Sequence, residues 1–196
     1  MKPQNPGEMK HYNLKQQPKF LNQFYETIDE ISQSSHPLAE NYSRKRLNLD
    51  EFPFFNIVVE DDKIVAFGGL QEGRWGKGIG RVATRLWVRP DHRKKGAVPS
   101  EFNSKILMPE QIKWAEQNGY DLVFWSRQYP NNRNFVRMIE RSNRNCPYGY
   151  HHEALPDVYN VCMDISDDES CWQKVAVVKL KNWRIPFDDR HTKRSD

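Results

Sequence analysis

The stretch that most limits the fold of this chain is residues 86–102, which read LWVRPDHRKKGAVPSEF. A run of β-forming residues ends at a proline, and a basic cluster and one glycine follow before Pro99. Proline is favoured at the first position of a helix, where its missing N–H is not needed. The stretch therefore predicts a strand that passes into a helix through a basic, glycine-containing loop. Free N–H groups at such a helix start bind phosphate, but a solvated surface loop has the same composition, and both interpretations stay open here.

The residues before this stretch predict helical structure followed by an antiparallel meander. Apolar side chains recur at helical spacing within residues 18–33, and residues 38–49 predict a second, more polar helix. A short strand is predicted at residues 10–14. Alternating apolar residues around a turn at 61–63 predict a hairpin, and residues 81–88 are rich in β-formers and predict the third strand of the meander.

The residues after the stretch predict a helix and then a buried strand. Residues 99–118 have helical composition, and we expect Pro109 to kink or split this helix and Gly119 to end it. Residues 121–126, DLVFWS, form a short apolar run that is typical of a strand buried on both faces.

The last third of the chain predicts one more helix and a pair of strands. The helix carries Phe135, Met138 and Ile139 on its apolar side. Residues 158–163 and 172–180 predict the two strands, which an acidic turn joins.

Length and charge narrow the class of protein. The 196 residues fit a single domain spanning 1–196, with an irregular arm at 1–8 and a charged tail at 182–196. The 30 basic and 26 acidic residues leave a net charge of +4, a weak bias that argues against a dedicated nucleic-acid binder.

The cysteines and the N-terminus indicate a cytoplasmic protein. Three scattered cysteines without a CxxC spacing, Cys146, Cys162 and Cys171, predict reduced thiols and neither a disulfide framework nor a metal site. The N-terminal residues contain no apolar core of a signal peptide, and no segment is long and apolar enough to span a bilayer. We therefore expect no membrane partner.

A second glycine motif invites a dinucleotide-binding interpretation, which the neighbouring residues argue against. Residues 78–83, GIGRVA, match the spacing G-x-G-x-x-[G/A]. That fingerprint needs a helix to begin at the glycines, so that helix N–H groups meet a pyrophosphate. The following residues VATRLWV favour a strand instead, so residues 73–80 are interpreted as a hairpin loop.

The order of predicted elements resembles the GNAT acetyltransferase superfamily. Residues 86–96 resemble the fourth strand of that family and its R-x-x-G-x-[G/A] loop, which holds the pyrophosphate of acetyl-CoA. Residues 132–141, NRNFVRMIER, resemble its later helix, whose opening asparagine lies beside the coenzyme A arm. The resemblance implies an α+β fold with a mixed, mostly antiparallel central sheet that is flanked by helices and splayed between its fourth and fifth strands.

The resemblance also implies a cofactor site and a reaction. The co-substrate is acetyl-CoA, no metal is involved, and the acceptor is a primary amine on a small molecule or a peptide. Backbone groups of residues 86–88 are expected to pair with the pantetheine arm as an added strand would, and the splay near Trp87 and Trp125 is expected to place the thioester. The implied cofactor-binding residues are Leu86, Trp87, Val88, Arg93, Lys94, Lys95, Gly96, Ala97, Val98, Asn132 and Phe135.

Three positions depart from the family pattern. Val98 stands where the loop usually ends in glycine or alanine, Val82 where a glutamate base is frequent, and Ile139 where many members carry a tyrosine acid. By position, the remaining candidates for catalysis are Ser126, Tyr129 and Glu72.

These departures keep two alternatives open beside the enzyme. One is a GNAT-like domain that binds acyl-CoA or a partner without catalysis, and the other is phosphate binding on nucleic acid by the basic clusters, against which the weak net charge argues. The sequence specifies neither the acceptor nor the oligomeric state. A homodimer stays open because cyclic dimers are the commonest soluble oligomers.

Overall fold

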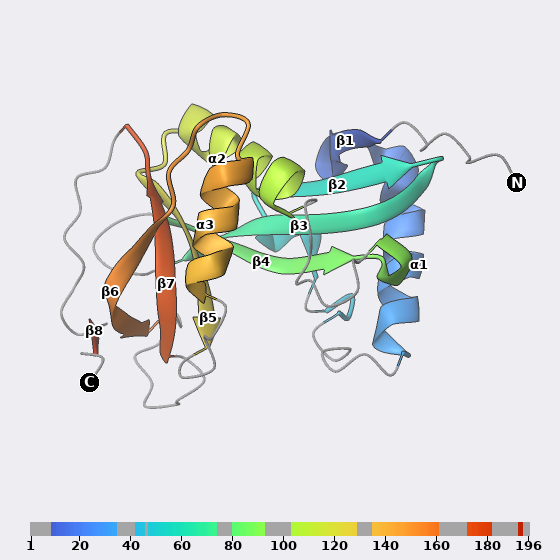
Figure 1. Cartoon of the computed structure of the whole chain (residues 1–196). Coiled ribbons are helices and arrows are strands. Elements are labelled where there is room, and N and C mark those ends of the chain that lie inside the picture. Colours follow the sequence, from blue (N-terminus) through green and yellow to red (C-terminus); the bar gives the residue numbers. More distant parts are fainter. Residues whose placement is uncertain are drawn as a thin grey trace, which may run out of the picture.

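The computed structural model describes eight stretches of the chain, to which every structural statement below is confined: residues 9–34, 42–45, 47–73, 80–92, 103–128, 135–160, 172–181 and 192–193. A central sheet of eight strands runs through the molecule in the order β1-β2-β3-β4-β5-β7-β6-β8 (Figure 1). All neighbouring strands are antiparallel except β4 and β5, which are parallel. The strands are β1 (Lys10–Asn13), β2 (Phe54–Glu60), β3 (Lys63–Gly73), β4 (Gly80–Val88), β5 (Leu122–Gln128), β6 (Glu153–Asn160), β7 (Trp172–Lys179) and β8 (Thr192–Lys193).

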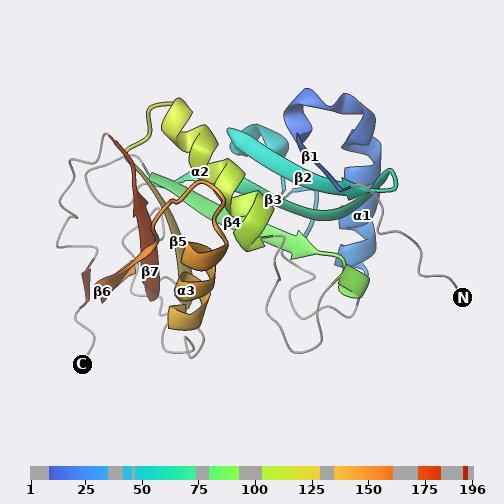
Figure 2. The same ribbon diagram turned by 45° about the horizontal axis from the view of Figure 1, so that its top comes forward.

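Helices cover both faces of the sheet. Helix α1 (Leu21–Ser32) lies on one face, and α2 (Met108–Gln117) and α3 (Phe135–Asn145) lie on the other (Figures 1 and 2). Neighbouring residues of β2 show the division, because Phe55 packs in the core beneath α1 and Phe54 in the core beneath α2 and α3. This arrangement confirms the predicted α+β class, with its mostly antiparallel sheet flanked by helices.

Most of the predicted elements are present. The predicted first helix corresponds to α1, which follows a 3₁₀ turn at Pro18–Phe20. The meander corresponds to β2, β3 and β4. The residues after Gly80 form a strand and not the helix that a dinucleotide-binding loop needs, which confirms the rejection of that interpretation. Residues 74–79 lie outside the described part of the chain.

The predicted helix at residues 38–49 is wrong in its described part. Residues 42–43 form a bend and residues 44–45 and 47 form turns, and a 3₁₀ turn follows at Leu49–Glu51. Asn48 is extended and its side chain accepts a hydrogen bond from the Asp50 N–H, which starts that turn. Tyr42, Leu47 and Leu49 are all buried in the α1 core, a spacing that no single helical face provides, so tertiary packing overrides the local preference.

The expected break at Pro109 is present. A π-helical turn at Asn103–Leu107 precedes α2, and Pro109 lies in the first turn of α2, where its missing N–H is tolerated. Gly119 follows the end of α2 with a φ of +76°, a left-handed conformation that glycine adopts without strain. Residues 99–102 lie outside the described ranges.

Of the two C-terminal strands, the second begins at Trp172 as predicted, but the first begins earlier than the sequence pattern predicts. Strand β6 starts at Glu153, and its pairing with β7 shifts register between Ala154 and Val158, where Pro156 interrupts the apolar alternation. The Lys174 ammonium donates to the Pro156 carbonyl at 3.0 Å across this irregularity. Within the predicted tail, β8 pairs with β6.

Candidate cofactor and active site

The two parallel strands at the centre of the sheet separate after a short ladder. Three residue pairs join them, from Gly80↔Leu122 to Val82↔Phe124, although β4 continues to Val88 and β5 to Gln128. Beyond these pairs the strands diverge, which confirms the predicted splay (Figure 1). We call the space between the diverging parts of β4 and β5 the strand gap.

A β-bulge shapes the β4 side of the strand gap. Between the pairs Phe67↔Trp87 and Gly69↔Thr84, β3 advances two residues while β4 advances three. The extra residue of β4 lies opposite Gly68, at Arg85 or Leu86. The bulge changes the direction of the backbone at the point where β4 has lost its partner β5.

The backbone of Val88, the last residue of β4, faces away from β3. The Arg89 N–H donates to the Val65 carbonyl of β3 at 2.8 Å, so the backbone of Arg89 faces β3. Backbone groups alternate sides along a strand, so those of Val88 face away from β3 and toward the gap. The Trp87 side chain is not available to the gap, because its ring stacks on Phe67 at 5.2 Å within the α1 core.

A tyrosine that the sequence analysis did not single out reaches this strand edge. The Tyr42 hydroxyl donates to the Leu86 carbonyl at 2.8 Å, and the buried Tyr42 ring lies edge-on to Phe67 at 6.2 Å. Buried tyrosine hydroxyls usually find a hydrogen-bond partner, so a lone tyrosine in a polar segment was the available signal. The sequence held no indication that the partner would be a β4 carbonyl 44 residues away.

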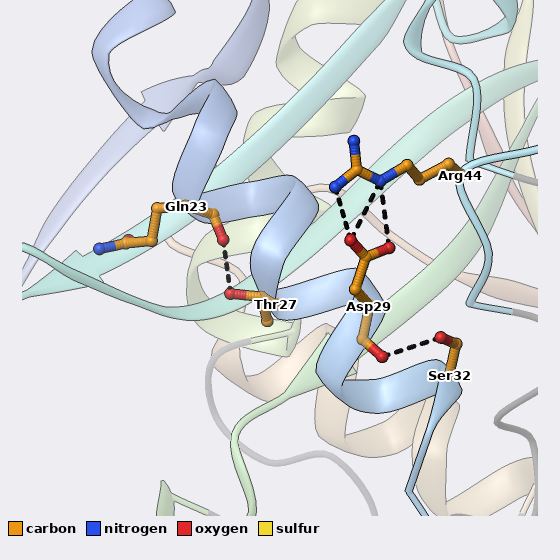
Figure 3. A network of polar contacts seen from close by, with 5 residues as sticks. All are labelled: Gln23, Thr27, Asp29, Ser32 and Arg44. Carbon is orange, nitrogen blue, oxygen red and sulfur yellow. Dashed lines mark hydrogen bonds and ion pairs between the residues drawn. The ribbon is translucent and has the colours of Figure 1, made fainter.

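The segment that carries Tyr42 is fastened to α1 two residues later. The Arg44 guanidinium donates to the Asp29 carboxylate through Nε at 3.1 Å and Nη2 at 2.5 Å (Figure 3). The guanidinium also lies 5.1 Å above the Tyr25 ring. The hydrogen bond from Arg44 lowers the pKa of Asp29 below its usual range. Both groups are exposed, so the pair orients the segment more than it stabilises the fold.

The β5 side of the gap is built from side chains. Trp125 is the first β5 residue beyond the last pair with β4, and its ring contacts Phe135 of α3 at 5.3 Å. The indole Nε1–H of Trp125 donates to Nδ1 of His152 at 3.0 Å. Burial lowers the pKa of His152 to about 4, so the imidazole is neutral at physiological pH and Nδ1 can accept.

Of the three catalytic candidates, Ser126 is the one whose side chain the structure describes. Ser126 is half-buried, and its hydroxyl hydrogen-bonds the Gln173 side chain of β7. Strand alternation puts Ser126 on the face opposite Trp125. Ile139, at the position of the usual tyrosine acid, is buried in the core beneath α2 and α3. Tyr129 and the side chains of Glu72 and Val82 lie outside the described part of the chain.

The predicted pyrophosphate loop begins directly after a charged tether. Nε2 of His92 lies 2.7 Å from the Glu60 carboxylate and Nδ1 lies 2.7 Å from that of Asp91. Partial burial opposes charging of His92, but the hydrogen bonds to both carboxylates outweigh it and raise its pKa. The loop residues themselves and the predicted asparagine lie outside the described ranges: Arg93, Lys94, Lys95, Gly96, Ala97, Val98 and Asn132.

A buried polar network holds the segment that follows this loop. Asn56 of β2 donates to the Leu107 carbonyl of the π-helical turn at 3.0 Å and accepts from Gln111 of α2 at 3.0 Å. Gly68 allows this approach, since a Cβ there would lie 3.1 Å from Nε2 of Gln111. The start of α2 is thereby fixed to the sheet beside β4.

The described residues form neither a metal site nor a helix that spans a membrane. They contain no group of three or more His, Cys, Asp or Glu side chains that could hold a metal ion. Of the helices in these residues, none is both long and apolar enough to cross a lipid bilayer. Cys146 is a free thiol.

Comparison with known families identifies the chain. Residues 21–143 match the family described as acetyltransferase (GNAT) family. The match covers more than half of the sequence and spans both sides of the strand gap, so the chain belongs to the GNAT acetyltransferase family and is an acetyl-transferring enzyme. No curated protein sequence matches it.

Solved structures share the fold at low identity. An N-acetyltransferase from Staphylococcus aureus has a TM-score of 0.54 at 12% identity, covering 88% of this chain and 97% of that one. The ribosomal-protein-S18-alanine N-acetyltransferase from Escherichia coli has a TM-score of 0.52 at 12% identity, covering 88% and 94%. PaiA N-acetyltransferase from Thermoplasma acidophilum, in complex with coenzyme A, has a TM-score of 0.50 at 14% identity, covering 88% and 99%.

Proposed function

We propose that the protein transfers the acetyl group of acetyl-CoA to a primary amine of a small molecule or a peptide. The observation that carries the proposal is the strand gap, in which a bulged β4 edge faces away from β3 where the parallel ladder with β5 has ended. A pantetheine arm carries amide groups and can pair with such an edge as an added strand does. Leu86, Trp87 and Val88 would supply the backbone groups.

The diphosphate of the cofactor would bind at the loop from Arg93 to Val98. The tether at His92 and the network around Asn56 support this proposal, because they hold the two ends that flank residues 93–102. Cations and helix N–H groups in that loop would attract the anion. Asn132 and Phe135 would border the arm from the α3 side.

The acceptor amine would approach from the α1 face of the sheet. The helices that follow the proposed cofactor loops, α2 and α3, occupy the opposite face, and Tyr42 approaches β4 from the α1 face. The Tyr42 hydroxyl donates to the Leu86 carbonyl, so Tyr42 lies at the β4 edge on the face from which we expect the amine to approach.

The reaction would be a direct transfer. The neutral amine nitrogen attacks the acetyl carbonyl carbon, the C–S bond breaks, the amine loses a proton and the coenzyme A thiolate takes one up. Ser126, Tyr129 and Glu72 stay candidates for proton transfer, with water as the alternative, because valine and isoleucine occupy the usual acid–base positions 82 and 139. We place the enzyme in the cytoplasm, where acetyl-CoA is available and a free thiol such as Cys146 persists.

Calorimetric titration with acetyl-CoA tests cofactor binding. We expect saturable binding by the unmodified protein and none by the double variant Arg93→Glu with Gly96→Asp. The control is Lys181→Glu, which reverses an exposed charge outside the site and should leave binding unchanged. Absence of binding at millimolar acetyl-CoA contradicts the proposal, and so does equal binding by the double variant.

Thiol release separates catalysis from binding without turnover. The acceptors are a peptide that begins with alanine, spermidine and an aminoglycoside, each assayed with saturating acetyl-CoA. Release with any of them supports the enzyme, whereas tight binding without release favours an acyl-CoA-binding domain, for which the apolar residues at 82 and 139 argue.

A further inference from the structure

We propose that Trp125, held in place by His152, forms the wall that limits the acyl group of the donor to acetyl size. This inference rests on the proposed function, because it takes the strand gap as the place of the thioester. Beyond that function, it assigns the selection of the donor's acyl chain length to Trp125 of β5. His152, 27 positions further along the chain, holds Trp125 in place.

The position of Trp125 makes it the first side chain beyond the end of the ladder. Phe124 is the last β5 residue that pairs with β4, and Trp125 follows it. Trp125 packs with Val123 and Phe135 in the core beneath α2 and α3, so its indole lies on the face where the proposed cofactor loops lead into helices. An acyl chain that enters the gap along β4 would meet this indole at the closed end.

Hydrogen bonds hold the indole in one orientation. Nε1–H of Trp125 donates to Nδ1 of His152 at 3.0 Å, and His152 is 2% exposed. The backbone of His152 is held in turn by Asn143 of α3, which accepts from its N–H at 2.6 Å and donates to its carbonyl at 3.0 Å. Rotation of the indole would leave a buried donor and a buried acceptor without partners, which is unfavourable.

The protonation state of His152 suits this role. Burial lowers its pKa to about 4, and the nearby His151 lowers it further, so Nδ1 remains an acceptor at neutral pH. A wall that is both packed and hydrogen-bonded cannot move aside for a longer chain, and a protein interior that must accept extra methylenes is strained. His152 therefore acts through Trp125 and is a positioning residue.

The test compares the affinities of acetyl-CoA and butyryl-CoA by calorimetry, which needs no acceptor. For the unmodified protein we expect acetyl-CoA to bind at least about tenfold more tightly, the smallest discrimination that a close-fitting apolar pocket provides between neighbouring chain lengths. With Trp125→Leu, the two added methylenes gain buried surface, and we expect the preference to fall below about threefold or to reverse. Trp114→Phe, a substitution of a tryptophan on α2 that stacks on Phe54, should keep the original preference.

Two substitutions of His152 test the positioning role. His152→Leu removes the acceptor and should weaken the preference for acetyl-CoA, because the indole becomes free to turn. His152→Asn can present an oxygen near the place of Nδ1 and should restore most of the preference. If both variants reduce it equally, His152 has only a structural role and the positioning claim is wrong.

The outcomes distinguish this inference from the proposed function. If Trp125→Leu binds acetyl-CoA and keeps the original preference, the acyl wall is wrong and the acetyltransferase proposal stands. If the unmodified protein binds neither thioester, both fail. Should Trp125→Leu not fold by circular dichroism, Trp125→Phe and the two His152 variants decide, because all three keep most of the buried volume. Trp125→Phe removes part of the indole and His152→Leu removes the hydrogen bond, whereas His152→Asn retains an acceptor.

Discussion

The two sides of the strand gap are constructed on different principles. The β4 side presents backbone, shaped by a bulge and supported by a dense aromatic core in which Phe67 contacts Phe24, Phe55 and Trp87. The β5 side presents a side chain, Trp125, whose orientation depends on hydrogen bonds to a distant residue. Backbone can pair with any amide-bearing arm, whereas a fixed side chain selects by shape, so the comparison suggests that one side binds the cofactor and the other limits its acyl group.

The largest effect should come from emptying the core on the β4 side. Phe67→Ala removes the ring on which Trp87 stacks and should lower the free energy of unfolding by about 3–5 kcal/mol. Urea denaturation followed by circular dichroism measures it. Trp125→Phe, which keeps a ring on the β5 side, serves as the comparison and should cost less; an equal or greater loss there would contradict the stated difference.

The histidines on the two sides should give pH dependences of opposite sign. His152 has a lowered pKa, so the unfolded chain binds more protons between pH 4 and 6.5, and stability should rise with pH across that window by up to about 3 kcal/mol at 1.4 kcal/mol per pKa unit. His92 has a raised pKa, so its contribution is complete below pH 6.5 and is lost as pH rises through the raised value.

Unfolding free energies measured from pH 4 to 9 test both signs. His152→Asn should flatten the acid limb, and His92→Gln should flatten the limb above pH 6.5. The assignment is wrong if both substitutions change the same limb.

Adjacent glycines of β3 should differ in their tolerance of a methyl group. A Cβ at Gly69 would lie 2.5 Å from Cδ2 of Phe55 and 2.6 Å from Cδ1 of Phe52, both rings of the α1 core. Gly69→Ala should therefore cost about 1–3 kcal/mol through overpacking against two rings, whereas a Cβ at Gly68 would meet only the end of the Gln111 side chain, at 3.1 Å, so Gly68→Ala should cost less. Thermal unfolding of both variants gives the order, and a reversed order would show that the α1 core is the more adaptable face.

The smallest expected change in stability concerns Tyr42. Tyr42→Phe removes one hydrogen bond to the β4 edge and should destabilise the fold by about 1 kcal/mol. If the hydroxyl orients the amine, KM for the acceptor rises while the affinity for acetyl-CoA stays the same. Tyr150→Phe, which loses a hydrogen bond to Glu116 of α2, is the matched control and should leave KM unchanged. An unchanged KM in Tyr42→Phe would limit Tyr42 to a structural role.

Much of the fold could be predicted from local patterns. Helical spacing in α1, alternation in β2 and β3, and the apolar run of β5 are properties of consecutive residues, and each appears in the structure where the pattern places it. Predictions failed where a distant contact outweighed the local preference. The segment of Tyr42, Leu47 and Leu49 has the composition of a polar helix, yet these three side chains are buried in the core beneath α1. In β6, Pro156 interrupts the apolar alternation, so the pattern does not predict the first half of the strand.

What the sequence determined by itself is the order of the described elements and the family, because the residue pattern at 86–102 and the periodicities around it are properties of neighbouring residues. Only the tertiary structure decided how the two sides of the gap are completed. The partners Tyr42 and Leu86 are 44 residues apart, and Trp125 and His152 are 27 apart. A hydrogen bond between such residues depends on strand register, on the bulge in β4 and on the packing of α3. None of these features produces a periodic pattern in the sequence around the two bonded residues.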